Sequence, residues 1–233
     1  MWYFRELPDG LVVRHTGPEH AGQLEELQRI CFPTLDDRER FKAPHYLSHV
    51  ALFPDGQFVA LDRDTVVGAA TTLRLHFDFE HVNHTFADII RGGWLTSHEP
   101  DGDWLYGADI GVHPAYRGRG LATALYAARQ ETVWRLGLKG QVIAGMMRDY
   151  GAARDRMTAR DYYQSVIEGR VRDSTLSMQL GVGFEPRVLL SNYVNDPACD
   201  NFAVLLVLDA DKVVRGASRT HAMSSSARPR HTE

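Results

Sequence analysis

The sequence predicts an α/β fold of the α+β kind, in which helices flank a sheet. Residues 57–61 and 65–75 are strand-like and are separated by only Asp62-Arg63-Asp64, so they should pair antiparallel. From Leu121, apolar residues recur at helical spacing until Gly137. Strand and helix patterns alternate along the chain without a linker between them, which favours one layered domain.

The other elements follow from the same periodicities and from turn residues. Pro33 ends the first predicted helix, and Pro54-Asp55-Gly56 is a strong turn signal before the hairpin. Residues 76–103 form a connection of a length that is usually functional or mobile. The predicted strands are 11–14, 57–61, 65–75, 104–112, 141–146, 187–193 and 201–208; the predicted helices are 17–32, 44–52, 85–90, 121–136, 158–168 and 174–180, the last closed by Gly181.

Composition is that of a soluble globular protein, because 44% of the residues are hydrophobic and 24% are charged. The net charge of −4 gives no general attraction to nucleic acid or an anionic membrane, so a site for a polyanion has to be local. No signal peptide or membrane span is predicted. Cys31 and Cys199 are expected to be free thiols in a reducing cytoplasm. Residues 1–210 are expected to form the domain and 211–233 a disordered tail.

The most informative segment is the turn Arg117-Gly118-Arg119-Gly120-Leu121-Ala122, which precedes the strongest predicted helix. The first amides of a helix lack partners and the helix dipole adds positive charge there, so a helix start is suited to binding phosphate. Gly118 and Gly120 let the backbone approach an anion closely. Arg117 and Arg119 supply local positive charge in a chain that is acidic overall.

This turn has three other interpretations. A plain tight turn, with glycines for geometry and arginines for solubility, remains open. A dinucleotide-binding turn fits poorly, because Thr123 occupies the third glycine position and the strand ending near Met146 offers no acid for a ribose. A P-loop is excluded, because no Gly-Lys-Ser/Thr follows.

In its context the turn resembles the R/Q-x-x-G-x-G/A motif of the GNAT superfamily of N-acetyltransferases, through Arg117, Gly120 and Ala122. The Gly183-Phe184 pair resembles the Gly-Phe that precedes the last two strands in that family. The order of predicted elements over residues 11–209 is also the family's. The resemblance implies a GNAT fold, with a mixed, mostly antiparallel sheet of about seven strands that is splayed between the fourth and fifth strands.

Residues 53–60, 100–103 and 173–180 further resemble GNAT modules that are fused to carbon–nitrogen hydrolases in bacteria. The chain is too short to carry such a hydrolase and is expected to be the acyltransferase module alone. Two functions follow from the resemblance. One is acetyl-CoA-dependent transfer of an acyl group to a primary amine of a small-molecule or peptide acceptor. The other is a non-catalytic acyl-CoA-binding module that acts with a separate hydrolase.

The resemblance also implies where acetyl-CoA binds. Its cleft would lie between the strands ending near Val112 and Met146. Backbone groups of Ile110, Gly111 and Val112 would bind the pantetheine arm, and a backbone amide of the same strand would stabilise the developing oxyanion. The pyrophosphate would bind at Arg117, Gly118, Arg119, Gly120, Leu121, Ala122 and Thr123.

Direct attack requires a neutral amine, so a base or a water chain has to accept its proton. Asp109 is the candidate catalytic base, because it lies on the strand where many family members place an acid; the alternative is that it faces solvent or pairs with an arginine. Gln179 stands where the family often has a tyrosine that protonates the departing thiolate. Either another group such as Ser177, Tyr162 or Tyr163 takes that role, or the thiolate leaves unassisted.

Three histidines, His76, His81 and His84, lie close together beside acidic residues. Their spacing fits no zinc motif, so no metal is expected, and they could line an acceptor pocket instead. The polar segment 147–173 is either an acceptor-recognition element or an additional surface helix. A homodimer is possible, as in many relatives, but no feature of the sequence decides it.

Overall fold

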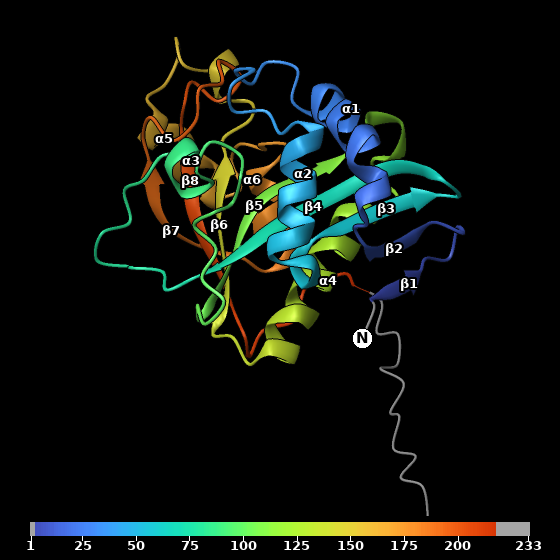
Figure 1. Ribbon diagram of the computed structural model, residues 1–233. Coiled ribbons are helices and arrows are strands. Elements are labelled where there is room, and N and C mark those ends of the chain that lie inside the picture. The colour runs from blue at the N-terminus through green and yellow to red at the C-terminus, as the bar shows by residue number, and fades with distance from the viewer. Residues whose placement is uncertain (1–2, 218–233) are drawn as a thin grey trace, which may run out of the picture.

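The computed structural model describes residues 3–217, in which one sheet carries helices on both faces (Figure 1). The strand order is β1-β2-β3-β4-β5-β6-β8-β7, and only β5 and β6 pair parallel. The predicted fold class is therefore confirmed. The strands are β1 Phe4–Glu6, β2 Val12–His15, β3 Phe58–Asp62, β4 Thr65–Leu75, β5 Trp104–Val112, β6 Gly140–Met146, β7 Glu185–Leu190 and β8 Ala203–Asp209.

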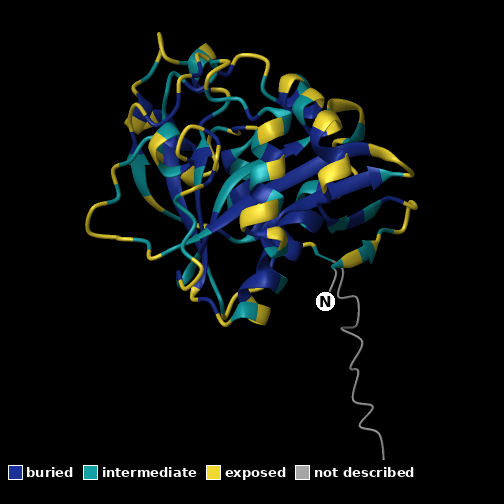
Figure 2. Ribbon diagram, in the orientation of Figure 1, coloured by how far each residue is buried: buried dark blue, intermediate teal, exposed yellow. Residues whose placement is uncertain are grey.

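The helices are held to the sheet by the alternation of side chains along its strands. In β3, Val59 packs with α1 and α2 on one face, whereas Phe58 and Ala60 pack with α4 on the other. Both faces of the central strands are consequently buried (Figure 2). The helices are α1 Ala21–Cys31, α2 Ala43–Leu52, α3 Phe86–Ile89, α4 Leu121–Leu136, α5 Ala159–Ile167 and α6 Leu176–Val182.

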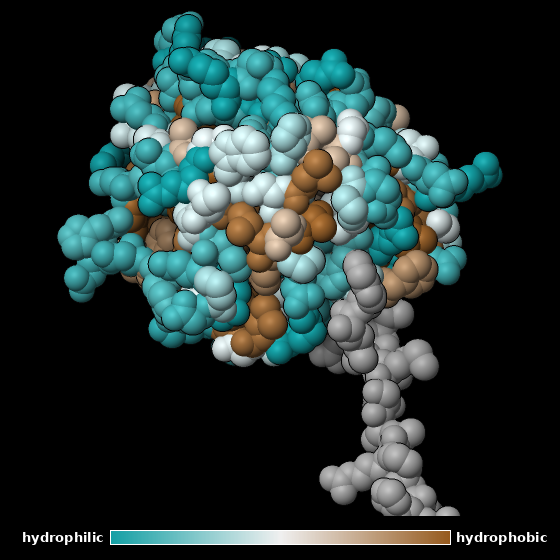
Figure 3. Space-filling model, in the orientation of Figure 1, coloured by the Kyte–Doolittle hydropathy of each residue, from teal (hydrophilic) through white to brown (hydrophobic). Residues whose placement is uncertain are grey.

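The outer face of α2 remains uncovered. Its Leu47 and Leu52 are exposed, and an apolar strip lies over this helix in the view of Figure 3. Within residues 3–217, no helix combines the length and the apolar character needed to cross a membrane.

Two details of the fold differ from the prediction. The sheet has eight strands where about seven were expected, because the three residues of β1 are too few to show a pattern. The sequence predicts that Gly181 closes the last helix, but α6 continues through it and ends at Gly183, whose φ of +116° is left-handed. Gly181 has no positive φ, so it is an ordinary helical residue.

The chain beyond β8 packs back onto the helices. Val214 is buried, and the backbone N–H of Arg215 donates to the carbonyl of Val182 at 2.9 Å. The side chain of Gln130 donates to the carbonyl of Lys212 at 2.9 Å. Residues 211–217 are therefore placed against the domain, although disorder was predicted from 211. The rest of the predicted tail, 218–233, lies outside the described residues.

The sheet is open between β5 and β6. Only three residue pairs join these strands, Leu105 with Gln141, Tyr106 with Val142 and Gly107 with Ile143. Beyond them β5 pairs with β4 alone and β6 with β8 alone. This gap lies between the predicted fourth and fifth strands, where the resemblance to the GNAT family implies a splay.

Candidate functional site

An outer cavity of about 480 Å³ lies where β5 ends and α4 begins. This volume is within the range of small-molecule binding sites. Among the predicted cofactor-binding residues, all except Arg119 lie on its wall: Ile110, Gly111, Val112, Arg117, Gly118, Gly120, Leu121, Ala122 and Thr123. The sequence motif and the end of β5 are thus brought to one cavity.

The start of α4 presents free backbone amides to this cavity. The N–H of Ala124 makes the first helical hydrogen bond, to the carbonyl of Gly120 at 2.9 Å, so the amides of the preceding residues have no helical partner. Gly118 and Gly120 have φ values of +76° and +79°, which disfavour any residue with a Cβ. No atom lies within 4 Å of an ideal Cβ at either glycine, so a side chain would have room there. Glycine is favoured at both positions because of the left-handed backbone conformation.

Arg119 points away from the outer cavity. Its guanidinium binds Asp9 at 2.7 Å and lies 5.2 Å from the centre of the Tyr116 ring. The structure therefore gives the side chain of Arg119 a role at the surface, and only its backbone remains near the predicted anion site.

Two arginines that the sequence did not indicate line the outer cavity together with Arg117. Arg148 follows β6, donates to the carbonyl of Cys31 at 3.0 Å and lies 5.6 Å from the centre of the Phe32 ring. Arg172 precedes α6. No local motif unites the three arginines, because only the tertiary fold brings them together.

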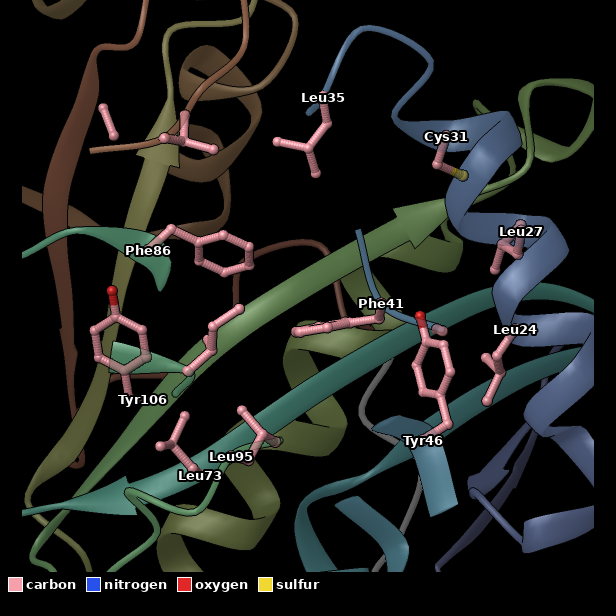
Figure 4. Close-up of a cluster of buried hydrophobic side chains, with 14 of the residues drawn as sticks. Leu24, Leu27, Cys31, Leu35, Phe41, Tyr46, Leu73, Phe86, Leu95 and Tyr106 are labelled. Carbon is pink, nitrogen blue, oxygen red and sulfur yellow. The ribbon is translucent and has the colours of Figure 1, made fainter. Parts of the chain in front are cut away.

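An inner cavity of about 90 Å³ lies in the gap between β5 and β6. Phe32, Ile110 and Thr175 line both cavities, so the two adjoin. Figure 4 shows the apolar side chains on the α1 side of the sheet, where Phe41 and Phe86 belong to the wall of the inner cavity. Polar groups on its wall include Gln28, Asp109, Arg129, Tyr126, Gln179 and Tyr193.

Asp109, the predicted base, faces the inner cavity. It lies next to a bulge in β5, because Thr71 pairs with Asp109 while Thr72 pairs with Gly107. The side-chain amide of Gln28 donates to its carboxylate at 2.6 Å. Burial raises the pKa of Asp109 to about 7, although Arg129, Gln28 and the N–H of Ile110 oppose the rise.

Arg129, on α4, contacts the backbone at this bulge. Its guanidinium donates to the backbone carbonyls of Asp109 and Thr71, the second at 3.2 Å. Among the described contacts, Arg129 donates to the backbone of Asp109 and makes no ion pair with its carboxylate, although the nearby guanidinium lowers the pKa of that carboxyl group. Gly107 leaves room for the guanidinium, since an ideal Cβ there would lie 2.6 Å from Nη1 of Arg129.

Gln179, which stands at the family's tyrosine position, lies on the wall of the inner cavity and is buried. Its side-chain amide donates to the hydroxyl of Tyr126 at 3.0 Å. Tyr126 comes from α4 and was not singled out by the sequence, because it lies within a helix pattern that reads as apolar core.

The other hydroxyls considered as proton donors lie elsewhere. Tyr162 donates to the carboxylate of Asp173 at 3.0 Å, and Ser177 accepts from the backbone N–H of Asp173 at 2.9 Å. Neither of them nor Tyr163 is on the wall of the inner cavity. Tyr162, on the buried face of α5, instead packs in the hydrophobic core.

The three histidines each have different partners in the fold. His84 hydrogen-bonds the carbonyl of Val82 at 2.7 Å and the hydroxyl of Tyr106 at 2.8 Å. His81 pairs with Asp78, and His76 lies near two other aspartates. In the part of the chain that the structure describes, no three His, Cys, Asp or Glu residues are grouped in a way that could hold a metal ion.

Two curated proteins have sequences similar to that of this chain. The protein named "Probable hydrolase YhcX" of Bacillus subtilis (strain 168) is 35% identical over 197 residues, which are 84% of this chain but only 38% of that protein. The "Uncharacterized N-acetyltransferase YkwB" of the same organism is 31% identical over 199 residues, 85% of this chain and 88% of that protein. The chain thus spans a little over a third of the first relative and most of the second.

Solved structures show the same fold. The GphF GNAT-like decarboxylase in complex with isobutyryl-CoA superimposes with a TM-score of 0.71 at 24% identity, over 85% of this chain and 98% of that chain. The model of the acetyltransferase (GNAT) family matches residues 21–155, more than half of the sequence. With the open sheet and the motif at the start of α4, these matches place the chain in the GNAT family of acetyltransferases.

Proposed function

We propose that the protein is an acetyl-CoA-dependent N-acetyltransferase that transfers the acyl group to a primary amine of a small-molecule or peptide acceptor by direct attack. The observation that carries this proposal is the junction of two cavities: an outer one lined by three arginines, and an inner one that contains the Asp109 carboxyl group. Family membership and the CoA ligand of the GphF structure support a CoA thioester as donor.

The residues of the outer cavity fit the donor. Free amides at the start of α4 and the guanidinium groups of Arg117, Arg148 and Arg172 suit a pyrophosphate and a phosphate. Backbone groups at the end of β5 that lack a β6 partner suit the amides of a pantetheine arm. When bound, acetyl-CoA supplies the activated acyl group.

Asp109 is suited to accept the proton of the attacking amine. With a pKa of about 7, a substantial fraction of its carboxyl groups is ionised at neutral pH, and each ionised group can take up a proton there. Gln28 holds one carboxylate oxygen by its 2.6 Å hydrogen bond. Amides of β5 that face the gap can polarise the thioester carbonyl, since no strand competes for them.

Donor binding is tested by thermal unfolding with acetyl-CoA, CoA, longer acyl-CoAs and NAD. Acetyl-CoA at 100 times its Kd should add about 2.7 kcal/mol, or roughly 5–10 °C in a chain of this size, and NAD should add nothing. Gly120→Glu should abolish the shift by crowding and repelling the pyrophosphate. Gly169→Glu is the matched control, because Gly169 has a similar φ of +74° and does not line the outer cavity.

Transfer itself is tested by the release of free thiol from acetyl-CoA in the presence of a panel of primary amines. An active acceptor should release thiol in proportion to the acetylated amine formed. If CoA binds but no amine in the panel releases thiol, the transferase proposal loses its support.

A non-catalytic acyl-CoA-binding module that acts with a separate carbon–nitrogen hydrolase is the second candidate. It is favoured by Gln179 at the usual tyrosine position and by the likeness of this chain to part of a protein named a probable hydrolase. This function predicts CoA binding without turnover. A steady-state rate of acetyl transfer to a small amine would exclude it.

A further inference from the structure

The polar segment 147–173 has both of its ends at the outer cavity. Arg148 follows β6 at one end, Arg172 precedes α6 at the other, and both arginines line the cavity. Each has an aspartate as its next residue in the sequence, Asp149 and Asp173, which do not line the cavity. The two aspartates are 24 positions apart in the chain and are joined by a hydrogen bond.

Asp173 is a fully buried carboxylate that holds three parts of the chain together. It is 0% exposed and accepts from the backbone N–H of Asp149 at 3.0 Å. It also accepts from the hydroxyl of Tyr162, on α5, at 3.0 Å, and from the N–H groups of Thr175 and Leu176 at 2.9 and 2.8 Å. A carboxylate out of water needs such a set of donors. The end of β6, α5 and the start of α6 are therefore fastened at one point.

Asp149 completes the connection in the opposite direction. Its carboxylate accepts from the backbone N–H of Ser174 at 2.6 Å and from the Ser174 hydroxyl at 3.1 Å. Each aspartate thus binds the backbone beside the other. We call this reciprocal set of hydrogen bonds among Asp149, Asp173 and Ser174 the aspartate brace.

The aspartate brace fixes the backbone from which the two arginines extend. Within residues 3–217, Arg172 has no hydrogen bond or ion pair, so its guanidinium is free to bind a ligand. The first amides of α6 already donate to Asp173 and are not available to an anion. Charge on this side of the cavity therefore comes from side chains, and a fixed backbone lowers the entropy that they lose on binding.

We infer that Asp149 and Asp173 are positioning residues of the donor site: the aspartate brace holds Arg148 and Arg172 where they meet the phosphate groups of CoA. The inference rests on the proposed acetyl-CoA-dependent function. It gives the segment 147–173 a role in donor binding, through the hydroxyl of Tyr162. Burial and the carboxylate of Asp173 raise the pKa of Tyr162, so this hydroxyl stays protonated and remains a donor.

Positioning and simple charge predict opposite signs. A carboxylate near a phosphate site repels the ligand, so its removal should strengthen CoA binding if only its charge matters. If the carboxylate holds the arginines in place, its removal should weaken CoA binding. The affinity for CoA, measured without any acceptor amine, distinguishes the two.

The test is calorimetric titration of the wild type, Asp149→Ala and Asp155→Ala with CoA. Asp149→Ala should raise the Kd about tenfold, as expected when one charge-assisted hydrogen bond to a phosphate is lost. Asp155→Ala is the matched control, because it removes the same charge from the same segment. The Asp155 side chain is 95% exposed and does not line the cavity, so the Kd should not rise. Asp149 is exposed as well, and thermal unfolding without ligand should show both variants folded.

Two further variants test how Asp149 acts. Asp149→Asn keeps an oxygen that can accept from the N–H of Ser174, so its Kd should stay within about threefold of the wild type. In a protein that carries both Arg148→Gln and Arg172→Gln, adding Asp149→Ala should change the Kd less than about twofold, because no guanidinium remains to be positioned. A purely structural role would weaken binding equally with and without the arginines.

Unchanged or tighter CoA binding by Asp149→Ala, with the wild type binding CoA, overturns the positioning role and leaves the proposed function standing. The same holds if Asp149→Ala has its full effect in the protein without the two arginines, or if Asp149→Asn binds as weakly as Asp149→Ala. A wild type that does not bind CoA overturns the proposed function and the inference with it.

Discussion

At the scale of single residues, Asp109 combines a carboxyl group with surroundings that keep it protonated until about pH 7. A base works only when deprotonated, so kcat/KM should fall as the pH drops below about 7. Asp109→Asn should lower kcat by roughly 10²–10⁴ and remove this acid limb. Initial rates with acetyl-CoA and an active amine from pH 5 to pH 9 measure both effects.

Gln28, which donates to the Asp109 carboxylate, allows a second test of whether Asp109 governs the pH dependence. The amide of Gln28 stabilises the ionised form of Asp109, so Gln28→Leu should raise its pKa further. The acid limb of the rate profile should then move to higher pH by about one unit, with the plateau rate little changed. An unmoved acid limb in this variant would show that another group governs the profile.

The sequence identified the residues that depend on a local pattern. Gly118 and Gly120 have the left-handed conformation that the motif requires, and Asp109 faces the cavity. Gln28 was missed, because it lies on a helix face whose pattern is typical of core, and its hydrogen bond to Asp109 forms only in the tertiary fold. Assigning the site residues to particular steps stays a prediction until the variants are measured.

At the scale of elements, the gap in the sheet depends on a small residue where pairing ends. A Cβ on Gly107 would lie 2.6 Å from Arg129 Nη1 and 2.8 Å from the side chain of Ile143. Because that arginine is buried and hydrogen-bonded, Gly107→Ala should reduce the free energy of unfolding by about 1–3 kcal/mol. Urea denaturation measures the change.

Gly181→Ala is the matched control for that substitution. Gly181 lies inside α6, has no positive φ and has no atom within 4 Å of an ideal Cβ. Alanine should therefore stabilise the protein there by about 0.5–1 kcal/mol. A loss of stability in both variants would point to a general intolerance of alanine, unrelated to the gap.

The long connection between β4 and β5 is tied to the cavity wall by a chain of three side chains. Nδ1 of His84 faces a carbonyl oxygen and so carries the hydrogen, which leaves Nε2 to accept from the hydroxyl of Tyr106. The Tyr106 oxygen lies 3.0 Å from the hydroxyl of Tyr193, which lines the inner cavity. The connection is therefore anchored at His84.

Removal of the middle hydroxyl tests this anchor. Tyr106→Phe removes the partner of Nε2 of His84 and of the Tyr193 hydroxyl, and should lower the free energy of unfolding by about 1–3 kcal/mol. Protease cleavage within residues 76–103 should become faster in the same variant. Tyr163→Phe, whose hydroxyl makes no such bond in the described structure, should change neither measurement.

Element prediction succeeded where caps and periodicity are strong. Thr158 was expected to cap a helix, and its side chain accepts from the N–H of Asp161 at 3.2 Å at the start of α5. It failed where the deciding contact is tertiary. The end of α6 depends on which of two glycines takes a left-handed conformation, and residues 211–217 are held by contacts to α4 and α6 that no local pattern contains.

At the scale of the whole molecule, Asp109 links stability to pH. In the folded protein its pKa is raised from 3.8 to about 7, so between these values the folded state binds the extra proton and stability falls as the pH rises. The effect is at most about 4 kcal/mol. Asp109→Asn should therefore be more stable than the wild type at pH 8, with a smaller advantage at pH 4. Urea denaturation at both pH values measures this; an advantage independent of pH would contradict the linkage.

The three residue pairs between β5 and β6 bear on the size of acyl group that we expect the gap to accept. They fasten two blocks of strands, β1 to β5 and β6 to β8, at one end only. A small rotation about these pairs would widen the far end while every strand keeps its other partner. We therefore expect the length of acyl chain that fits the gap to depend on the angle between the two blocks of strands as well as on the side chains around it.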